Sequence, residues 1–412
     1  MPIRQVIFLH NVEYMLPSPT EAPKIPRILA LDVLRGFALG GILMVNILGM
    51  AYLFKADSPS ASGFVNLFFQ GKFYVLFSFL FGYSFTMQMR SADRDGASRT
   101  GRMVRRCVAL IVLGALHLVF LWLGDILLVY GIAGLALLVL SRLSPKAALI
   151  VGGVILTAIS ALTVFAGGDG SENGPMFTPA EKATLLADYR GDFLSAAEAR
   201  LEVFGALGFG SPVATALAVL PLFLFGLAAG KVRLLEDPAK YTRLLPRAQW
   251  IGLGIGGSLT LALNISQWTD TAPENVAVGI SILASPLLAM GYAATVLRIA
   301  HHLKWFAAAG KIAATNYIAQ SVITAILFTG AGFALADRLP AWIALAIAAT
   351  IFLAQLAFSA WWTRNHRYGP IEWLLRKATY AFSPSHPPHS PQNPKNSHAP
   401  QTPTPPPPTN PL

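Results

Sequence analysis

The sequence is poor in cysteine and in charged residues. A single cysteine, Cys107, excludes an intramolecular disulfide, and no spacing of Cys and His residues resembles a zinc or haem site. Charged residues make up 12% of the chain, whereas about 25% is typical of globular proteins. The composition therefore argues against a soluble enzyme and against metal or redox chemistry.

Long apolar runs dominate the sequence instead. Hydrophobic residues make up 54% of the chain, and many of the runs reach the roughly 20 residues that a helix needs to cross a bilayer. The pattern predicts an all-α fold, a polytopic transmembrane helical bundle. Ten spans are predicted, at 28–54, 66–89, 107–122, 125–141, 147–166, 212–230, 249–267, 275–300, 306–335 and 341–362.

The third and fourth of these spans are predicted to form a hairpin. Residues 107–141 are almost continuously apolar, but a single helix of that length would exceed the roughly 30 Å hydrocarbon core by about 20 Å. Trp122, Gly124 and Asp125 mark the expected turn.

The distribution of lysine and arginine predicts the topology. If both termini are cytoplasmic, 22 of the 31 basic residues fall in inner segments and five in outer segments. This bias follows the positive-inside rule and favours an even number of spans. The net charge of +11 is then a feature of topology, so nucleic acid is not an expected partner. The expected partner is the lipid bilayer, and the predicted location is a bacterial cytoplasmic (inner) membrane.

The bundle is predicted to occupy 24–382, with three segments outside the bilayer. Residues 1–23 are predicted to be cytoplasmic and uncleaved, because no small-residue cleavage site follows their apolar run. Residues 167–211 form a periplasmic loop, in which Pro179 begins a stretch typical of interfacial helices that would serve as a lid. Residues 383–412 are too rich in proline to fold, and are predicted to be a disordered cytoplasmic tail.

Polar residues within the spans are the candidate functional residues, because ionisable groups in lipid are costly. Asp32 and Arg35 lie one turn apart and can pair. Asn46 lies on the same helix face, about 16 Å further along the axis. One interpretation is an ion pair and an interhelical hydrogen bond. The other is that the pair contacts substrate and that the Asn46 amide stabilises an oxyanion.

His117 and Asp125 form a second candidate site. His117 lies within the third span, and a break at Gly124 would fold Asp125 back toward the imidazole. A carboxylate there would orient the ring, and a neutral imidazole could act as the general base that acyl transfer requires. The alternative is a histidine that is satisfied by a backbone carbonyl.

Four further residues are weaker candidates for substrate contact. Lys72 lies near a helix end, where a lysine is expected to extend toward the headgroups. Asn316 and Gln320 share one face of the ninth span, where they would either join helices or line a polar path. Glu372 follows the last span in a predicted interfacial helix, and a structural ion pair with an arginine is favoured there.

Five blocks of this sequence resemble the YeiB-like bacterial membrane proteins, the group called domain of unknown function 418. The blocks occur in matching order and reach both ends of the membrane region. They are LDVLRGFALGGILMVNI at 31–47, GKFYVLFSFLFGYSF at 71–85, GALHLVFLWLGDILLVYGIAG at 114–134, GKIAATNYIAQS at 310–321 and QLAFSAWWTRNHRYGPIEWLLR at 355–376.

That group is similar to a wider superfamily of transmembrane acyltransferases. Its heparan-alpha-glucosaminide N-acetyltransferases move an acetyl group from cytosolic acetyl-CoA to a sugar across the membrane. In those enzymes the essential histidine closely follows the asparagine that Asn46 matches. Residues 47–63 of this chain contain no histidine, and Asp57 stands at about the position of that histidine. Either His117 has taken this role or the chemistry is absent. The first span carries the similarity, at Asp32, Arg35, Gly36 and Asn46.

The leading hypothesis is a transmembrane acyltransferase that uses a cytosolic acyl-CoA, with acetyl as the expected acyl group. The acceptor would be a small molecule, glycan or lipid in the periplasm or envelope. Arg35 and loop arginines would meet the phosphates of the donor. No metal and no permanently bound cofactor is expected, and a homo-oligomer is compatible with the sequence.

Two rival functions remain open. In a transporter or permease of a small polar solute, Asn46, His117, Asn316 and Gln320 would line a site near the bilayer midplane. In a non-catalytic sensor, the tail at 383–412 would be required for function, whereas an acyltransferase should tolerate its deletion.

Overall fold

The computed structural model describes residues 28–53, 58–166, 178–207, 211–236, 241 and 243–381, and the regular elements in these ranges are helices. The predicted segments at 1–23 and 383–412, and Asp57, lie outside them. In chain order the elements are α1 (Leu29–Tyr52), α2 (Pro59–Phe68), α3 (Lys72–Arg94), α4 (Arg99–Phe120), α5 (Leu127–Leu140), α6 (Pro145–Ala166), α7 (Pro179–Tyr189), α8 (Phe193–Leu207), α9 (Ser211–Lys231), α10 (Leu244–Ile251), the π-helical turn η2 (Gly252–Gly256), α11 (Gly257–Trp268), α12 (Glu274–Arg298), α13 (Lys304–Lys311), α14 (Ala313–Phe328), α15 (Ala341–Asn365) and α16 (Pro370–Tyr380).

Seven candidate membrane spans occur among the described residues, and an eighth if the bent pair α13–α14 is one span. The protein is therefore a polytopic helical membrane protein. The α5 helix is apolar but shorter than these spans, and α10, η2 and α11 follow one another without interruption. The seven comprise α1, α2 with α3, α4, α6, α9, α12 and α15.

Apolar side chains also cover the outside of the bundle. Val154, Phe165, Trp250 and Ile265 are among many large apolar residues that are at least half exposed. Because lipid tails are as apolar as these side chains, such a surface is stable in a bilayer and unfavourable in water.

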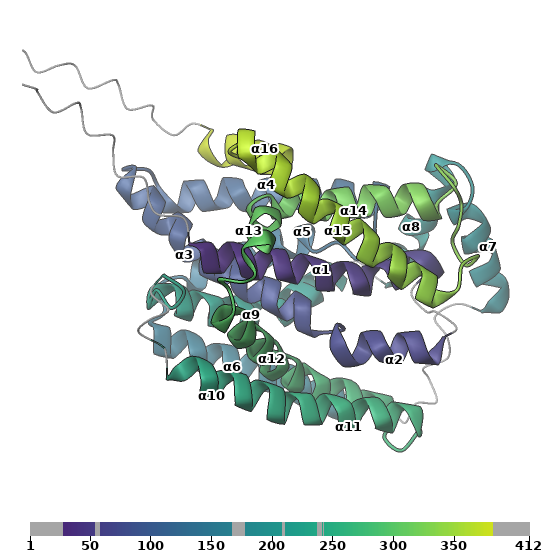
Figure 1. The fold of residues 1–412 in the computed structure, drawn as a ribbon, viewed down its shortest axis with the longest axis horizontal. Helices are drawn as coiled ribbons and strands as arrows, with labels where there is room; N and C mark the ends of the chain where they lie inside the picture. Colours follow the sequence, from purple (N-terminus) through teal and green to yellow (C-terminus); the bar gives the residue numbers. More distant parts are fainter. Residues whose placement is uncertain are drawn as a thin grey trace, which may run out of the picture.

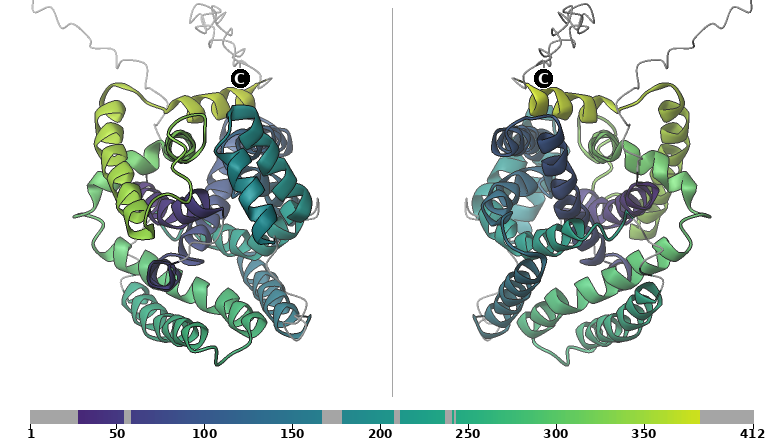
Figure 2. Two further views of the ribbon diagram at one scale, coloured as in Figure 1. Left: turned by 90° about the vertical axis from the view of Figure 1, so that its right-hand side faces the viewer. Right: turned by 90° about the vertical axis from the view of Figure 1, so that its left-hand side faces the viewer.

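The α1 helix runs through the middle of the bundle (Figures 1 and 2), in contact with α3, α13, α14 and α15. Its first half belongs to one buried apolar cluster, which includes Leu34 and Leu39, and its second half to another, which includes Ile47 and Ala51. Polar side chains on α1 are therefore held inside the protein rather than against lipid.

The hairpin predicted between the third and fourth spans is confirmed. The α4 helix ends at Phe120 and α5 begins at Leu127, so the connection contains Gly124 and Asp125 as expected. The two helices pack against each other, which places Asp125 beside the end of α4.

Two helices of the predicted periplasmic loop lie at one end of the bundle (Figure 1, α7 and α8). The α7 helix begins at Pro179, as predicted. The Thr178 N–H donates to the Glu181 carboxylate at 2.7 Å, and the Glu181 N–H donates to the Thr178 hydroxyl at 3.3 Å. The hydrogen bonds from Thr178 lower the pKa of Glu181. The pair therefore fixes the start of α7.

The ninth span was predicted to be continuous over 306–335, and this is wrong. The chain bends by 80° between α13 and α14, at Ile312. Glycines let α13 cross close to α1, since a Cβ atom at Gly310 would lie 1.8 Å from the carbonyl oxygen of Asp32. Hydropathy does not reveal such a break, because it does not report the direction of the helix axis.

Close contact between α3 and α9 also depends on glycine, which gives a testable prediction. A Cβ atom at Gly82 would lie 2.1 Å from the carbonyl oxygen of Phe223. We expect Gly82→Ala to destabilise the purified protein by about 1–3 kcal/mol, because the two backbones must separate. Gly153→Ala on α6 is the matched control, since no atom lies within 4 Å of its added Cβ. Thermal unfolding in detergent measures both, and equal stabilities would contradict the role of Gly82.

Candidate functional site

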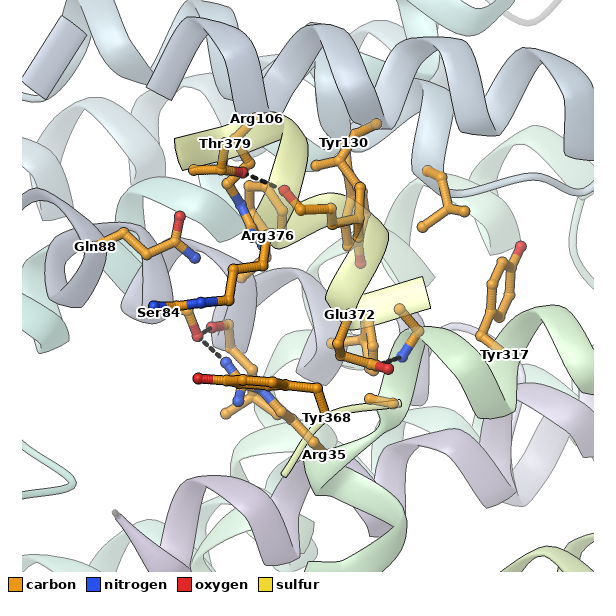
Figure 3. A pocket seen from close by; sticks show the side chains of 18 of the residues that line it. Arg35, Ser84, Gln88, Arg106, Tyr130, Tyr317, Tyr368, Glu372, Arg376 and Thr379 are labelled. Carbon is orange, nitrogen blue, oxygen red and sulfur yellow. Dashed lines mark hydrogen bonds between the residues drawn. The ribbon is translucent and has the colours of Figure 1, made fainter. Parts of the chain in front are cut away.

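A cavity of about 340 Å³ lies near the N-terminal end of α1, between α1, α3, α4, α5, α14 and α16 (Figure 3). We call it the basic cavity, because among its lining residues five are cationic and one is a carboxylate. The cations are Arg35, Arg102, Arg106, Lys311 and Arg376, the carboxylate is Glu372, and the lining tyrosines are Tyr130, Tyr317, Tyr368 and Tyr380.

Neighbouring side chains position the arginines. The predicted Asp32–Arg35 pair is confirmed, with Oδ1 of Asp32 3.5 Å from Nη1 of Arg35. Arg35 also donates to the hydroxyl of Ser84, as the dashed line in Figure 3 shows. The guanidinium of Arg376 lies over the Tyr380 ring, 4.3 Å from its centroid. These contacts hold the cations around the cavity before any ligand enters.

The Glu372 carboxylate is hydrogen-bonded to the N-terminal end of α14. It accepts hydrogen bonds from the backbone N–H groups of Ala314 and Thr315, at 2.7 and 3.2 Å, and from the Thr315 hydroxyl at 2.6 Å. It thereby caps the N-terminus of α14, where a negative charge is stabilised by the helix dipole. Counting Asp32 and Asp95, which pair with Arg35 and Arg102, five cations face three carboxylates, and this excess of positive charge makes the basic cavity suitable for an anion.

Next to this cavity lies a buried series of three polar side chains, Asp125, His117 and Ser321. Nδ1 of His117 is 2.9 Å from Oδ1 of Asp125, a close contact without the alignment of a hydrogen bond. Nε2 of His117 is 2.8 Å from the hydroxyl oxygen of Ser321. The second oxygen of Asp125 accepts from the N–H of Leu128 at 2.6 Å. The predicted approach of Asp125 to the imidazole is therefore present, and Ser321 extends it.

A single aromatic ring separates this series from the basic cavity. Tyr317 lines the cavity, and its ring centroid lies 5.0 Å from that of His117. The Tyr317 hydroxyl contacts the carbonyl oxygen of Gly124 at 3.5 Å and accepts from the N–H of Ile126 at 3.3 Å. Ile126 also lines the cavity. The imidazole thus lies directly behind the cavity wall.

A second cavity, of about 600 Å³, is lined by the C-terminal half of α1, by α2 and by α11. We call it the amide cavity, because none of its lining residues is charged and several are amides. Asn46 lines it. The other amide and aromatic residues of its wall are Asn66, Gln70, Asn264, Gln267, Trp122 and Trp268. Such a lining can donate and accept hydrogen bonds but offers no counter-ion for a charged ligand.

Similarity to known proteins places the chain in one family. The family described as "Protein of unknown function (DUF418)" matches residues 229–382. The uncharacterized protein YxaH of Bacillus subtilis (strain 168) is 32% identical over 389 residues, which cover 86% of this chain and 94% of that protein. The chain belongs to the DUF418 family.

Two further proteins of similar length support this assignment. The uncharacterized protein YeiB of Escherichia coli (strain K12) is 31% identical over 384 residues, covering 86% of this chain and 96% of YeiB. An uncharacterized 39.9 kDa protein in the amylase 3′ region of Bacillus acidopullulyticus is 28% identical over 382 residues, covering 86% and 94%. The YeiB-like resemblance predicted from the sequence is confirmed.

The structure separates two residues that were predicted to act together. Asn46 lines the amide cavity, whereas His117 lines neither cavity and faces Asp125 and Ser321. Lys72 does not extend outward as expected. It is 3% exposed and donates to the backbone carbonyl of Asn66 at 2.5 Å, because α2 folds over it.

Asn316 and Gln320 join helices and line neither of the two cavities. The Asn316 amide donates to the Ser359 hydroxyl at 2.8 Å, and the Gln320 amide donates to the Gln355 side chain at 2.8 Å. Both partners are on α15. The interpretation of these two residues as interhelical hydrogen-bond partners therefore fits the structure better than a polar path.

Sequence reasoning gave no specific role to Ser321 or Tyr317. Tyr317 and Ser321 are four residues apart on α14, so they share a helix face, but nothing in that spacing identifies His117 as their neighbour. Arginines of the inner loops were predicted to meet donor phosphates, but the sequence did not show that Arg102 and Arg106 line a cavity together with Arg35.

Proposed function

We propose that this DUF418 protein is a transmembrane acyltransferase of the bacterial cytoplasmic membrane. It would take an acyl group, acetyl in the simplest case, from a cytosolic acyl-CoA at the basic cavity. The acceptor would be a neutral periplasmic or envelope molecule with hydroxyl groups, bound at the amide cavity. The catalytic base would be His117.

The proposed topology has ten spans and cytoplasmic termini. The count of ten follows if the pair α13–α14, the short α5 and the continuous α10–α11 segment each cross the bilayer alongside the seven longer spans. The basic cavity then lies on the cytoplasmic side, together with the arginines of 90–106. The amide cavity lies toward the periplasmic side, where α7 and α8 are.

One observation carries the proposal: the connection between α4 and α5 reaches both cavities. Trp122 lines the amide cavity and Ile126 lines the basic cavity. Between them in the chain, Asp125 contacts His117. In this proposal His117 as general base and Asp125 as its orienting carboxylate would serve a site suited to an anionic donor and a site suited to a neutral acceptor.

The charges of the basic cavity suit the donor. Coenzyme A carries a pyrophosphate and a further phosphate, and guanidinium groups bind phosphate oxygens by short, charge-assisted hydrogen bonds. Arg35, Arg106 and Arg376 would hold these phosphates, and the tyrosines would contact the apolar parts of the arm. Glu372 would keep the start of α14 in place. The thioester would then extend toward Tyr317.

The amide cavity suits a neutral acceptor. Asn46 would orient the acceptor there, which replaces the oxyanion role predicted for it from the sequence. Indole rings such as Trp268 offer flat apolar faces, and the amides offer both donors and acceptors. The Asp125 carboxylate would orient the imidazole and stabilise its protonated form, as in other histidine bases.

The test is binding of acetyl-CoA and of its truncated forms to the purified full-length protein in detergent. Calorimetry should show that affinity falls from acetyl-CoA to acetyl-dephospho-CoA and again to acetyl-pantetheine. We expect each step to cost about tenfold or more, because each removes charge-assisted hydrogen bonds. Absence of binding, or equal affinity for all three, would contradict the proposed donor site.

A permease is the second candidate, and the 80° break between α13 and α14 is the observation that favours it. Broken helices often form solute sites in transporters. An assay of acetyl-CoA binding and hydrolysis distinguishes the two functions. An acyltransferase should bind acetyl-CoA and hydrolyse it slowly in the absence of acceptor, and a permease should do neither.

A further inference from the structure

We propose that Ser321 is the nucleophile of the reaction and carries the acyl group as a covalent ester. This inference rests on the proposed function, and it adds a step to it. The acyl group would pass from the thioester to Ser321, and only then to the acceptor. His117 would serve both half-reactions as base and acid.

The geometry points to this role because the imidazole is aimed at a hydroxyl. With the Asp125 carboxylate 2.9 Å from Nδ1, the favoured tautomer carries its hydrogen on Nδ1 and leaves Nε2 as an acceptor. The Ser321 hydroxyl, 2.8 Å away, then donates to Nε2. Carboxylate, imidazole and hydroxyl in this order form the arrangement that activates serine in hydrolases of unrelated folds.

The residues of this series differ from the hydrogen-bonded pairs that only join helices. Asn316 with Ser359, and Gln320 with Gln355, are neutral pairs. Asp125, by contrast, places a carboxylate with a fully buried side chain in the interior of a membrane protein. Burial of an ionisable group is costly, and such groups in membrane interiors are rare outside functional sites. A hydrogen bond between α4 and α14 alone would not require it.

Burial would also protect the acylated serine. Ser321 is 1% exposed and His117 is 2% exposed, so water has little access to an ester formed there. The route from the donor is short but closed. Tyr317 lies one helical turn before Ser321 on α14 and lines the basic cavity. The thioester can reach Ser321 only if the Tyr317 ring moves aside.

The two half-reactions balance without any further reagent. In the first, the Ser321 oxygen attacks the thioester carbonyl, its proton passes to Nε2 of His117, and the sulfur of coenzyme A leaves and takes up that proton. In the second, His117 removes the proton of an acceptor hydroxyl, which attacks the serine ester. The Ser321 oxygen then leaves and regains the proton from His117.

A serine-directed fluorophosphonate tests the nucleophile without acyl-CoA. In this reaction an oxygen–phosphorus bond forms at Ser321 and fluoride leaves. The purified full-length protein in detergent should be labelled at Ser321, as identified by mass spectrometry. Ser321→Ala, His117→Gln and Asp125→Asn should each lower the labelling rate by about 100-fold or more. The matched control is Ser160→Ala, a buried serine that donates to the Gly279 carbonyl, and it should be labelled at the wild-type rate.

Two further measurements separate nucleophilic from structural roles. Ser321→Cys should lose fluorophosphonate labelling but still gain one acetyl group at position 321 from acetyl-CoA, because a thiol is also an acyl nucleophile. Tyr317→Ala should speed the labelling of Ser321, since it opens the wall of the basic cavity. Labelling that persists in Ser321→Ala, or that is equal in Asp125→Asn and wild type, would overturn the inference.

Failure of this inference can be told apart from failure of the proposed function. Binding and transfer of acetyl from acetyl-CoA with neither fluorophosphonate labelling nor an acetyl-serine would show direct transfer, and the acyltransferase would survive without a covalent step. Labelling of Ser321 in a protein that does not bind acetyl-CoA would retain the nucleophile and reject the donor.

Discussion

Replacement of His117 by alanine should abolish acyl transfer while leaving binding of acetyl-CoA intact. The imidazole does not line the basic cavity, so the donor site should survive its removal. The chemical step should not, because His117 is the group positioned to accept a proton, with Asp125 on one side and Ser321 on the other. General base catalysis of this kind contributes about 10² to 10⁴ in rate. Transfer of radiolabelled acetyl to an envelope acceptor measures the loss.

The experiment needs a control for folding, because His117→Ala removes the neighbour of the buried Asp125 carboxylate and could destabilise the protein. His117→Gln keeps a hydrogen-bonding side chain of similar size beside Asp125, and should be equally inactive yet as stable as wild type. His301→Ala changes an exposed histidine between α12 and α13 and should transfer acetyl at the wild-type rate. Undiminished transfer in His117→Gln would remove the base assignment.

Loss of the cavity arginines should produce the second large effect, and it should appear in donor binding. We expect Arg106→Gln and Arg376→Gln each to weaken acetyl-CoA binding by about tenfold or more, because a hydrogen bond to a charged group contributes about 1.5–3 kcal/mol. Both residues line the basic cavity. Arg142→Gln is the control, since Arg142 is exposed and does not line the basic cavity.

The double variant, Arg106→Gln with Arg376→Gln, tests whether the two arginines bind the same part of acetyl-CoA. If Arg106 and Arg376 contact the same phosphates, their effects should be non-additive. If they contact different phosphates, their effects should add. In both cases the double variant should bind acetyl-pantetheine as well as wild type does, because that ligand has no phosphate. Equal acetyl-CoA affinity in the Arg376→Gln and Arg142→Gln variants would show that the charge of the basic cavity does not hold the donor.

The sequence alone predicted the features that depend on local patterns. The apolar runs predicted a helical membrane protein, and Gly124 marked a hairpin that α4 and α5 form. Pro179 marked the start of α7. The contact between Asp32 and Arg35 followed from their spacing on one helix. Each of these features is determined by a few neighbouring residues, or by the general requirement that side chains facing lipid are apolar.

Tertiary packing decided the rest, because the partners of a polar side chain come from distant segments. The chain bends at Ile312, directly after Gly310 and Lys311, but hydropathy reports neither the bend nor its angle. Asn46 and His117 both looked suited to one chamber, but packing put Asn46 at the amide cavity and turned His117 toward Ser321, 204 residues away in the chain. Hydropathy tells which segments are apolar enough to lie in the bilayer. Which hydroxyl meets which imidazole is set by how the helices cross, and only the folded structure contains that information.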